Sequence, residues 1–189
     1  MTDMPANPNK TPLLRKLDHV DIHDLQQAVS GLSKTVWEQT NHTKPNRFAA
    51  LNKTQHIVFK FIDSFSDWRK SHTLPLWKEW EHLILPVIQK AVTPYQYEKG
   101  EFSRIMLALL PAGEKITRHI DGAPAAQFPH KLHIPIITNS KTFFCFDKQR
   151  FNFETGAVYE VNNNIYHWAE NNGDTNRVHL IFEYFPVPG

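Results

Sequence analysis

The sequence predicts an α+β protein, mainly β, in which a largely helical N-terminal half buttresses a C-terminal antiparallel β-barrel. Apolar residues recur at helical spacing in two segments before Gly100. After Gly100, short β-rich segments follow one another with turn residues between them, and such a series is typical of a sandwich or barrel. No linker-like stretch divides the halves. We therefore expect one domain over residues 13–189, with the helical buttress at about 13–100 and the barrel core at about 101–189.

The N-terminal half begins with a polar segment rich in Pro and Asn, residues 1–12, which predicts a disordered arm. Apolar residues at helical spacing then predict a helix over residues 24–38. The pattern of a second helix extends from Thr73, its expected cap, to about residue 92, and we expect Pro86 to kink it. The expected elements are thus a strand at 13–20, a helix at 24–38, a loop at 41–46, a strand at 56–61 and a helix at 73–92.

Strands are expected in the C-terminal half at residues 103–110, 115–120, 132–138, 142–146, 157–161, 165–169 and 177–185. The last two are separated by a turn that contains Asn172-Gly173. This dipeptide is a strong hairpin signal because both residues can adopt positive φ. A hairpin centred there would place His167 opposite Arg177 and Val178.

Composition and charge argue against several classes of protein. The 21 basic and 19 acidic residues are well mixed and give a net charge of +2, so we expect neither nucleic acid nor an anionic membrane as a partner. The single cysteine, Cys145, excludes an internal disulfide framework. The start of the chain lacks the pattern of a signal peptide, and no apolar run approaches the ~18 residues of a spanning helix. We therefore expect a soluble, cytoplasmic protein.

His119, Asp121 and His167 are candidate metal ligands. Residues two apart on a β-strand point to the same face, so His119 and Asp121 can offer an imidazole and a carboxylate to one ion. The expected hairpin would add His167. Two histidines and one carboxylate, with open coordination positions, form the facial triad of non-haem Fe(II) oxygenases. The alternative is a surface histidine followed by an aspartate that caps the turn at Gly122.

Arg177 and His133 are candidate anion-binding residues. An arginine that points into a barrel is unfavourable unless it is paired, and its planar guanidinium suits a carboxylate-bearing co-substrate. Glu183, on the same alternation, is the internal alternative. His133 would donate a second hydrogen bond to that carboxylate, act as a metal ligand, or be a core histidine. The other histidines show no metal spacing and are expected to be structural or surface residues: His19, His23, His42, His56, His72, His82, His130 and His179.

Several short motifs occur in a characteristic order over about residues 103–185. They are Leu109-Leu110-Pro111-Ala112-Gly113, His119-Ile120-Asp121, His133-Ile134-Pro135-Ile136, Gly156, the segment Asn163 to His167, Asn172-Gly173, and Arg177-Val178-His179-Leu180. In this order and spacing the chain resembles the aspartyl/asparaginyl β-hydroxylase family. The resemblance implies a double-stranded β-helix, a jelly-roll or cupin-like barrel. It also implies Fe(II) bound by His119, Asp121 and His167, and 2-oxoglutarate whose distal carboxylate is bound by Arg177 and His133.

The resemblance further implies a dioxygenase that consumes 2-oxoglutarate and O₂ and hydroxylates an amino-acid side chain, aspartyl, asparaginyl or proline-like, free or in a polypeptide. The presence of Asp121 makes the chain more similar to bacterial members, including proline cis-hydroxylases, and argues against a halogenase. The family's second basic position near His133 is Lys131 here, so no role is carried over to it. The alternatives are a cupin-type metalloenzyme that does not use 2-oxoglutarate, and a non-catalytic module that binds metal or 2-oxoglutarate.

The mouth of the expected pocket has candidate residues of its own. The loop at 122–129, the segment 46–48 and Trp168 are expected to border it. Arg47 and Arg118 are candidates to pair with a substrate carboxylate. A solvated loop is the alternative for each.

Overall fold

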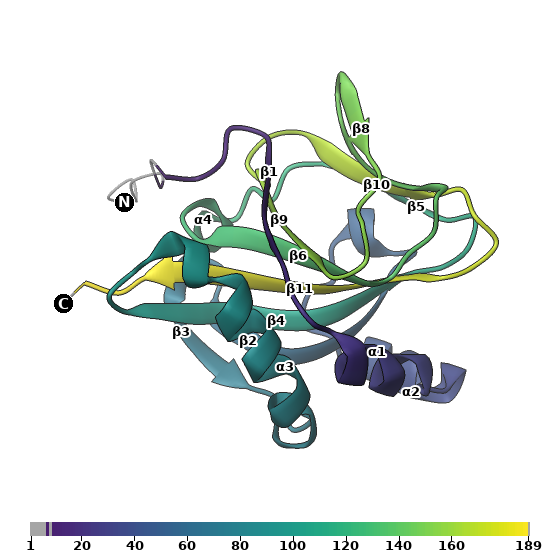
Figure 1. Cartoon of the computed structure of the whole chain (residues 1–189), viewed down its shortest axis with the longest axis horizontal. Helices are drawn as coiled ribbons and strands as arrows, with labels where there is room; N and C mark the ends of the chain where they lie inside the picture. The colour runs from purple at the N-terminus through teal and green to yellow at the C-terminus, as the bar shows by residue number, and fades with distance from the viewer. Residues whose placement is uncertain (1–6, 8, 189) are drawn as a thin grey trace.

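Two antiparallel β-sheets face each other in the computed structural model, which describes residues 7 and 9–188 (Figure 1). The larger sheet has the order β1-β9-β6-β11-β4-β2-β3, and the smaller sheet has the order β5-β10-β7-β8. The strands are β1 (Leu14–His19), β2 (Gln55–Ser64), β3 (Asp67–Thr73), β4 (Gly100–Leu110), β5 (Lys115–His119), β6 (His130–Ile137), β7 (Thr142–Phe146), β8 (Gln149–Phe151), β9 (Ala157–Val161), β10 (His167–Asn171) and β11 (Arg177–Pro186). This arrangement confirms the expected β-rich jelly-roll fold.

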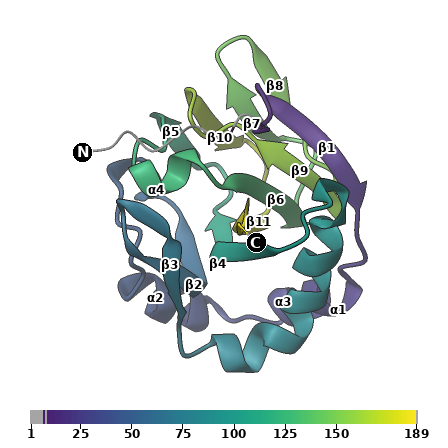
Figure 2. The same ribbon diagram turned by 90° about the vertical axis from the view of Figure 1, so that its left-hand side faces the viewer.

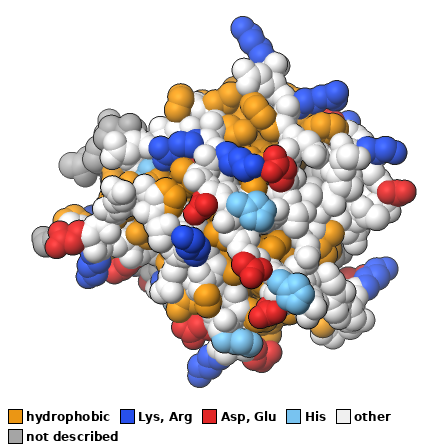
Figure 3. Space-filling view, in the orientation of Figure 1, with side chains coloured by type: hydrophobic (Ala, Val, Ile, Leu, Met, Phe, Trp, Pro, Cys, Tyr) orange, Lys and Arg blue, Asp and Glu red, His pale blue; other side chains and the backbone are white. Residues whose placement is uncertain are grey.

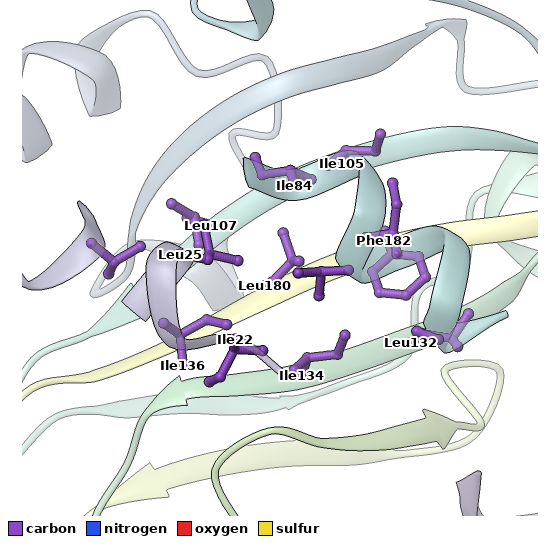
Figure 4. Close-up of a cluster of buried hydrophobic side chains, with 14 of the residues drawn as sticks. Ile22, Leu25, Ile84, Ile105, Leu107, Leu132, Ile134, Ile136, Leu180 and Phe182 are labelled. Atoms are coloured by element: carbon purple, nitrogen blue, oxygen red, sulfur yellow. The ribbon is translucent and has the colours of Figure 1, made fainter. Parts of the chain in front are cut away.

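Helices cover the outer face of the larger sheet, as Figure 2 shows. They are α1 (His23–Ser30), α2 (Lys34–His42) and α3 (Trp77–Ala91). Three further short helices lie elsewhere in the described part of the chain: α4 (Pro124–Gln127), η1 (Ala49–Leu51) and η2 (Thr93–Tyr95). Alternate residues of the central strands point to these helices and form the main core with them, and Figure 4 shows part of this cluster. Leu132 and Ile134 of β6 and Leu180 and Phe182 of β11 are fully buried there. The intervening residues of the same strands must point to the opposite face, toward the smaller sheet.

The expected helix over residues 24–38 is in fact two helices. The first ends at Ser30, Gly31 follows it, and the second begins after Ser33. The Ser33 hydroxyl accepts a hydrogen bond from the Val36 amide (3.4 Å), which makes Ser33 an N-cap. The apolar spacing persists across the break, so periodicity alone did not reveal it. The second helix also extends to His42, into the expected loop.

Thr73 does not cap a helix. It is the last residue of β3, a strand that the sequence did not predict, and the helix α3 begins at Trp77. Strand β3 lies at the edge of the larger sheet, and Trp68 is its only buried residue. An edge strand with so much exposed surface lacks the apolar alternation on which the prediction depended.

The expected hairpin between β10 and β11 is also wrong. These strands belong to different sheets, so the segment 172–176 is a crossover rather than a hairpin turn. Among the described residues the glycines with positive φ are Gly113 and Gly156, so Gly173 lacks the φ that an Asn-Gly hairpin turn needs. The buried Asn171 holds the crossover, because its Nδ2 donates to the carbonyl oxygens of Leu110 (3.1 Å) and Thr175 (2.9 Å).

The expectation of a disordered arm over residues 1–12 is wrong for residues 7 and 9–12, which the structure describes. Residues 1–6 and 8 lie outside the described residues. Asn7 is buried, and its Nδ2 lies 3.1 Å from His130 Nε2. The Lys10 ammonium donates to the Pro129 carbonyl (2.9 Å), and the Thr11 amide donates to Glu160 (3.2 Å). Composition indicated disorder, but the polar side chains of this segment have polar partners on the barrel.

The surface in Figure 3 carries basic and acidic side chains interspersed with apolar ones, as the mixed charges of the sequence predict. Within residues 7 and 9–188, none of the helices has the length and apolar character needed to cross a bilayer.

Candidate metal and co-substrate site

A cavity of about 240 Å³ lies between the two sheets. All five residues that the sequence singled out line it: His119, Asp121, His133, His167 and Arg177. The two facing sheets bring these residues together, whereas the sequence suggested that a hairpin would do so. The larger sheet contributes His133 and Arg177, whereas β5, β10 and the residues after β5 contribute the other three.

The three candidate metal ligands converge at one point. His119 and His167 are directly opposed in the pairing of β5 with β10, and their ring centroids are 4.4 Å apart. Asp121 lies just beyond the end of β5, and its amide donates to the Asn163 carbonyl (3.0 Å). One ligand atom from each of the three residues lies within 4.8 Å of the other two. Asp121 is therefore positioned by the segment before β10 and not by strand alternation, which the sequence analysis had assumed.

Hydrogen bonds orient each ligand. The Nδ1 atom of His119 lies 2.7 Å from the Thr117 carbonyl oxygen, and the Nδ1 atom of His167 lies 2.9 Å from that of Ile165. A carbonyl oxygen can only accept, so both imidazoles donate from Nδ1 and leave the Nε2 lone pair available. Such outer partners fix the tautomer and direction of metal-binding histidines. Sequence reasoning could not name them.

The Asp121 carboxylate is held by one of its two oxygens. Its Oδ2 accepts from the Lys131 ammonium and from Asn163 Nδ2 (3.2 Å). Its Oδ1 lies 3.5 Å from His119 Nε2, on the side of the two imidazoles. Lys131, for which the sequence suggested no role, is thus an outer partner of a candidate metal ligand.

The protonation states suit a divalent cation. Burial alone would raise the pKa of Asp121, but the charge of Lys131 and the nearby His119 outweigh burial and hold that pKa well below its ordinary range. Burial lowers the pKa of His167 to about 4. At neutral pH the set therefore offers an ionised carboxylate and a neutral His167 imidazole, the forms that bind metal. The donor set fits Fe(II), with two imidazole nitrogens and one carboxylate oxygen.

A second cluster surrounds Arg177, which is 2% exposed. Arg177 Nη2 donates to His179 Nδ1 (2.7 Å), and His133 Nδ1 lies 3.4 Å from the same nitrogen. Four buried nitrogen atoms of this cluster have no hydrogen-bond partner among the described residues: Arg177 Nε, Arg177 Nη1, His133 Nε2 and His179 Nε2. Buried donors without acceptors are unfavourable, so this cluster fits an anion with several acceptor oxygens, such as a carboxylate.

The charge of this cluster also suits an anion. Burial lowers the pKa of Arg177 to about 9, which leaves the guanidinium charged at neutral pH. Burial and then the charge of Arg177 lower the pKa of His133 and of His179 well below the ordinary range, so both imidazoles are neutral. The cluster therefore carries one positive charge that no acidic side chain within it offsets.

His179 is a residue that the sequence analysis missed. It was grouped with the structural histidines, although it stands two residues after Arg177 on one strand and must share its face. Glu183, the internal partner considered for Arg177, is instead bound to Arg104 and Ser103.

The mouth of the cavity is lined by residues of the expected segments, among them Asn46, Phe48, Gly122 and Trp168. The two arginines considered there are bound elsewhere. Arg118 pairs with Asp147 (2.8 Å), and Arg47 Nη2 donates to the His42 carbonyl (2.5 Å).

Comparison with known proteins decides the family. The family model described as aspartyl/asparaginyl beta-hydroxylase matches residues 84–186, more than half of the chain. The chain belongs to this family. The expected class of enzyme is thereby confirmed: the protein is a hydroxylase dependent on Fe(II) and 2-oxoglutarate, with O₂ as the second co-substrate.

Solved structures agree on the fold of this β-hydroxylase. The viral collagen prolyl hydroxylase vCPH from Paramecium Bursaria Chlorella virus-1, in its 2-oxoglutarate complex, is 11% identical, with a TM-score of 0.58 over 93% of this chain and 97% of that one. An oxidoreductase of the 2-oxoglutarate-Fe(II) oxygenase family from Burkholderia pseudomallei is 10% identical, with a TM-score of 0.56 over 90% of this chain and 92% of that one. At such identities the likeness concerns the fold alone. No curated protein sequence matches the chain.

Proposed function

We propose that this β-hydroxylase holds Fe(II) with His119, Asp121 and His167, and binds the distal carboxylate of 2-oxoglutarate with Arg177 and His133. The observation that carries the proposal is the convergence of two imidazole nitrogens and one carboxylate oxygen within 4.8 Å in a cavity that also contains a buried guanidinium. In this proposal the three metal-binding residues are also the catalytic residues.

The bound iron supplies the redox chemistry that couples oxidative decarboxylation of 2-oxoglutarate, to succinate and CO₂, with hydroxylation of a substrate C–H bond. The protein's own residues prepare this step. Lys131 and Asn163 fix one oxygen of Asp121, so that the other oxygen is free for the metal. Arg177 fixes the orientation of the co-substrate by its charge and planar geometry.

An aromatic ring of the same cavity covers one side of this centre. The ring of Phe144 stacks against His167 with centroids 5.6 Å apart and lies edge-on to His133 at 5.5 Å. Phe144 thus touches both the metal cluster and the arginine cluster. A ring in this position keeps solvent from that side of the reacting centre.

The proposed substrate is an aspartyl, asparaginyl or prolyl side chain, in a free amino acid or in a polypeptide. Membership of the family supports the amino-acid class. We further propose a cytoplasmic location, which the single, buried Cys145 favours because disulfide-dependent proteins belong to oxidising compartments.

Succinate formation from 2-oxoglutarate, with Fe(II) and O₂, tests the proposal. The wild type should form succinate, and a panel of free amino acids and Asp-, Asn- or Pro-containing peptides should contain a compound that stimulates it. His119→Ala should abolish turnover, whereas His82→Ala, an exposed histidine of α3, should not. Absence of succinate despite tight Fe(II) binding would contradict the proposal.

Arg177→Ala separates this function from that of a metalloenzyme that does not use 2-oxoglutarate. The variant should lose 2-oxoglutarate binding and retain Fe(II), because the guanidinium donates a hydrogen bond to His179 and to none of the three metal-binding side chains. Calorimetric titration with each ligand measures the two affinities separately. Equal 2-oxoglutarate affinity in variant and wild type would contradict the role given to Arg177.

A further inference from the structure

A second buried guanidinium, that of Arg104, lines the cavity far from Arg177. Arg104 lies on β4 directly opposite Glu183 of β11, whereas Arg177 stands six residues before Glu183 on that strand. Six residues of β-strand span roughly 20 Å. Arg104 therefore cannot bind the same carboxylate group as Arg177, and the proposed function leaves it without a role.

Arg104 is held rigidly. Its Nη1 donates to both carboxylate oxygens of Glu183, at 2.5 Å each, and the Ser103 hydroxyl donates to Glu183 Oε2 (3.0 Å). The guanidinium carbon lies 5.4 Å from the centre of the Phe61 ring. One nitrogen and one face of the guanidinium are thus fixed by neighbours.

The other edge of the guanidinium is available to a ligand. Both hydrogen bonds that Arg104 makes with described residues come from Nη1, and a guanidinium has three further N–H donors, on Nε and Nη2. The side chain lines the cavity and is only 10% exposed, so these donors are largely withdrawn from bulk solvent. Two parallel N–H donors on one edge suit a carboxylate.

The position of Arg104 fits one end of an amino-acid-sized molecule. Lys131, Glu183 and Arg104 are direct cross-strand neighbours on β6, β11 and β4. Two strand spacings, about 10 Å, therefore separate Arg104 from Lys131, and Lys131 binds Asp121 of the proposed metal centre. A substrate anchored at Arg104 can place its reacting carbon near that centre.

The aromatic ring that packs on Arg104, that of Phe61, belongs to a buried apolar cluster. Trp68 and Phe185 belong to the same cluster, and Trp68 meets Phe185 edge-on with centroids 6.5 Å apart. An apolar cluster disfavours a continuing polypeptide with its polar backbone, so we expect the group that reaches Arg104 to be the end of a molecule or of a side chain.

From these contacts we infer that Arg104 binds a terminal carboxylate of the substrate and determines specificity, with Glu183 as its positioning residue. The inference rests on the proposed function, because it places the substrate between Arg104 and the metal centre. The carboxylate has two sources: the α-carboxylate of a free amino acid, or the side chain of an acidic residue in a peptide.

Five compounds distinguish these sources. L-Proline and L-asparagine carry only an α-carboxylate, N-acetyl-L-aspartyl amide carries only a side-chain carboxylate, and L-prolinamide and N-acetyl-L-asparaginyl amide carry none. Succinate formation is measured against the concentration of each. Either the two compounds with an α-carboxylate or the compound with a side-chain carboxylate should stimulate succinate formation. The two compounds without a carboxylate should not.

Arg104→Lys tests the residue itself. Lysine keeps the charge beside Glu183 but lacks the second donor edge, so the KM of the carboxylate-bearing substrate should rise about tenfold or more, the usual range for a lost hydrogen bond to a charged group. The affinity for 2-oxoglutarate, measured by calorimetry, should change less than about twofold, because Arg177 is remote. The double variant R104Q/E183Q should likewise raise the KM of the substrate with little change in the affinity for 2-oxoglutarate. It guards against misfolding, since it leaves neither charge unpaired.

Arg69→Lys is the matched control. Arg69 also pairs with a carboxylate, Asp67 (2.8 Å), and lies over an aromatic ring, that of Trp68 (5.7 Å), but it is exposed on the edge strand β3. The KM of the Arg69→Lys variant for the carboxylate-bearing substrate should equal that of the wild type.

Three outcomes would overturn the inference. The first is a KM that Arg104→Lys and the double variant leave unchanged, and the second is equal stimulation by the compounds without a carboxylate. The third is a wild type that binds 2-oxoglutarate and responds to none of the five compounds, which would leave the proposed function intact. A wild type that neither binds 2-oxoglutarate nor forms succinate would instead contradict the proposed function, and the inference would fall with it.

Discussion

Asn163 binds Asp121 twice, once with its side chain and once with its backbone. Its Nδ2 donates to Asp121 Oδ2 (3.2 Å), and its carbonyl oxygen accepts from the Asp121 amide (3.0 Å). The same Nδ2 donates to the Ala126 carbonyl (3.0 Å), and Asn163 is fully buried. One residue thus joins a proposed metal ligand to the short helix α4, which contributes Ala126 to the cavity wall.

We expect Asn163→Ala to weaken Fe(II) binding by roughly 10- to 100-fold, the usual effect of losing an outer partner of a metal ligand. The carboxylate of Asp121 would keep Lys131 but lose the bond that fixes its rotation. Anaerobic calorimetry with Fe(II) measures the affinity. Asn164→Ala is the control, because Asn164 Nδ2 donates to the Gln127 carbonyl (3.0 Å) and not to Asp121. Equal losses in both variants would contradict the role of Asn163.

His179→Phe should weaken 2-oxoglutarate binding. Phenylalanine preserves the stacking against Phe153, whose ring centroid lies 5.9 Å away, but it cannot accept the hydrogen bond from Arg177 Nη2. A hydrogen bond to a charged group contributes about 1.5–3 kcal/mol, so the affinity should fall by roughly 10- to 100-fold. Calorimetric titration of the Fe(II)-loaded protein with 2-oxoglutarate measures it.

The Fe(II) affinity of His179→Phe should remain that of the wild type. His179 forms hydrogen bonds with Arg177 and His133 but with none of the proposed metal ligands. Loss of both affinities together would show that His179 supports the cavity as a whole and not the orientation of Arg177.

Local sequence pattern predicted the existence of most strands, because buried strands such as β6 and β11 carry a period-two apolar signal. It did not predict which strands pair. The Asn172-Gly173 turn has the local chemistry of a hairpin, but β10 pairs with β5 and β7, and β11 pairs with β4 and β6. Pairing is decided by contacts between distant segments, which a turn signal does not contain.

The residues of the candidate site likewise divide into those that local sequence identifies and those that it does not. The five predicted residues that line the cavity together have distinctive chemistry and spacing, so sequence reasoning found them. Their outer partners Lys131 and Asn163 lie on other elements, and nothing in their local sequence connects them with Asp121. His179 is different, because its place two residues after Arg177 predicts a shared face and could have identified it.

Asn171→Ala should destabilise the fold. The buried Asn171 side chain donates to the carbonyl oxygens of Leu110, Pro111 and Thr175, and its Oδ1 accepts from Thr142 Oγ1 (3.2 Å). Removing it leaves several buried polar groups unpaired, each at about 1–3 kcal/mol, so we expect a loss of roughly 3–5 kcal/mol in the free energy of unfolding. Urea denaturation measures it. Asn172→Ala is the control, since the Asn172 side chain donates to the half-buried Glu170 carboxylate at the surface and to no other described residue, and a similar loss there would contradict the expectation.

The stability of the protein should also depend on pH through His56, which is 2% exposed. Lys44 Nζ lies 3.2 Å from His56 Nδ1 and can only donate, so Nδ1 accepts and the imidazole is neutral. Thr54 Oγ1 lies 3.4 Å from Nε2 on the other side. Burial and then the charge of Lys44 lower the pKa of His56 to about 3.

The sign of the effect follows from proton binding. An unfolded histidine has a pKa near 6.5, so between pH 6.5 and 3 the unfolded state binds a proton that the folded state excludes, and stability falls as pH falls. From pH 7 to pH 5 the contribution of His56 alone should be a loss of roughly 2 kcal/mol. Urea denaturation at both pH values should show a smaller difference in His56→Gln, which keeps an amide for both neighbours. His72→Gln, an exposed histidine of β3, should behave as the wild type, and an undiminished pH difference in His56→Gln would exclude His56 as its source.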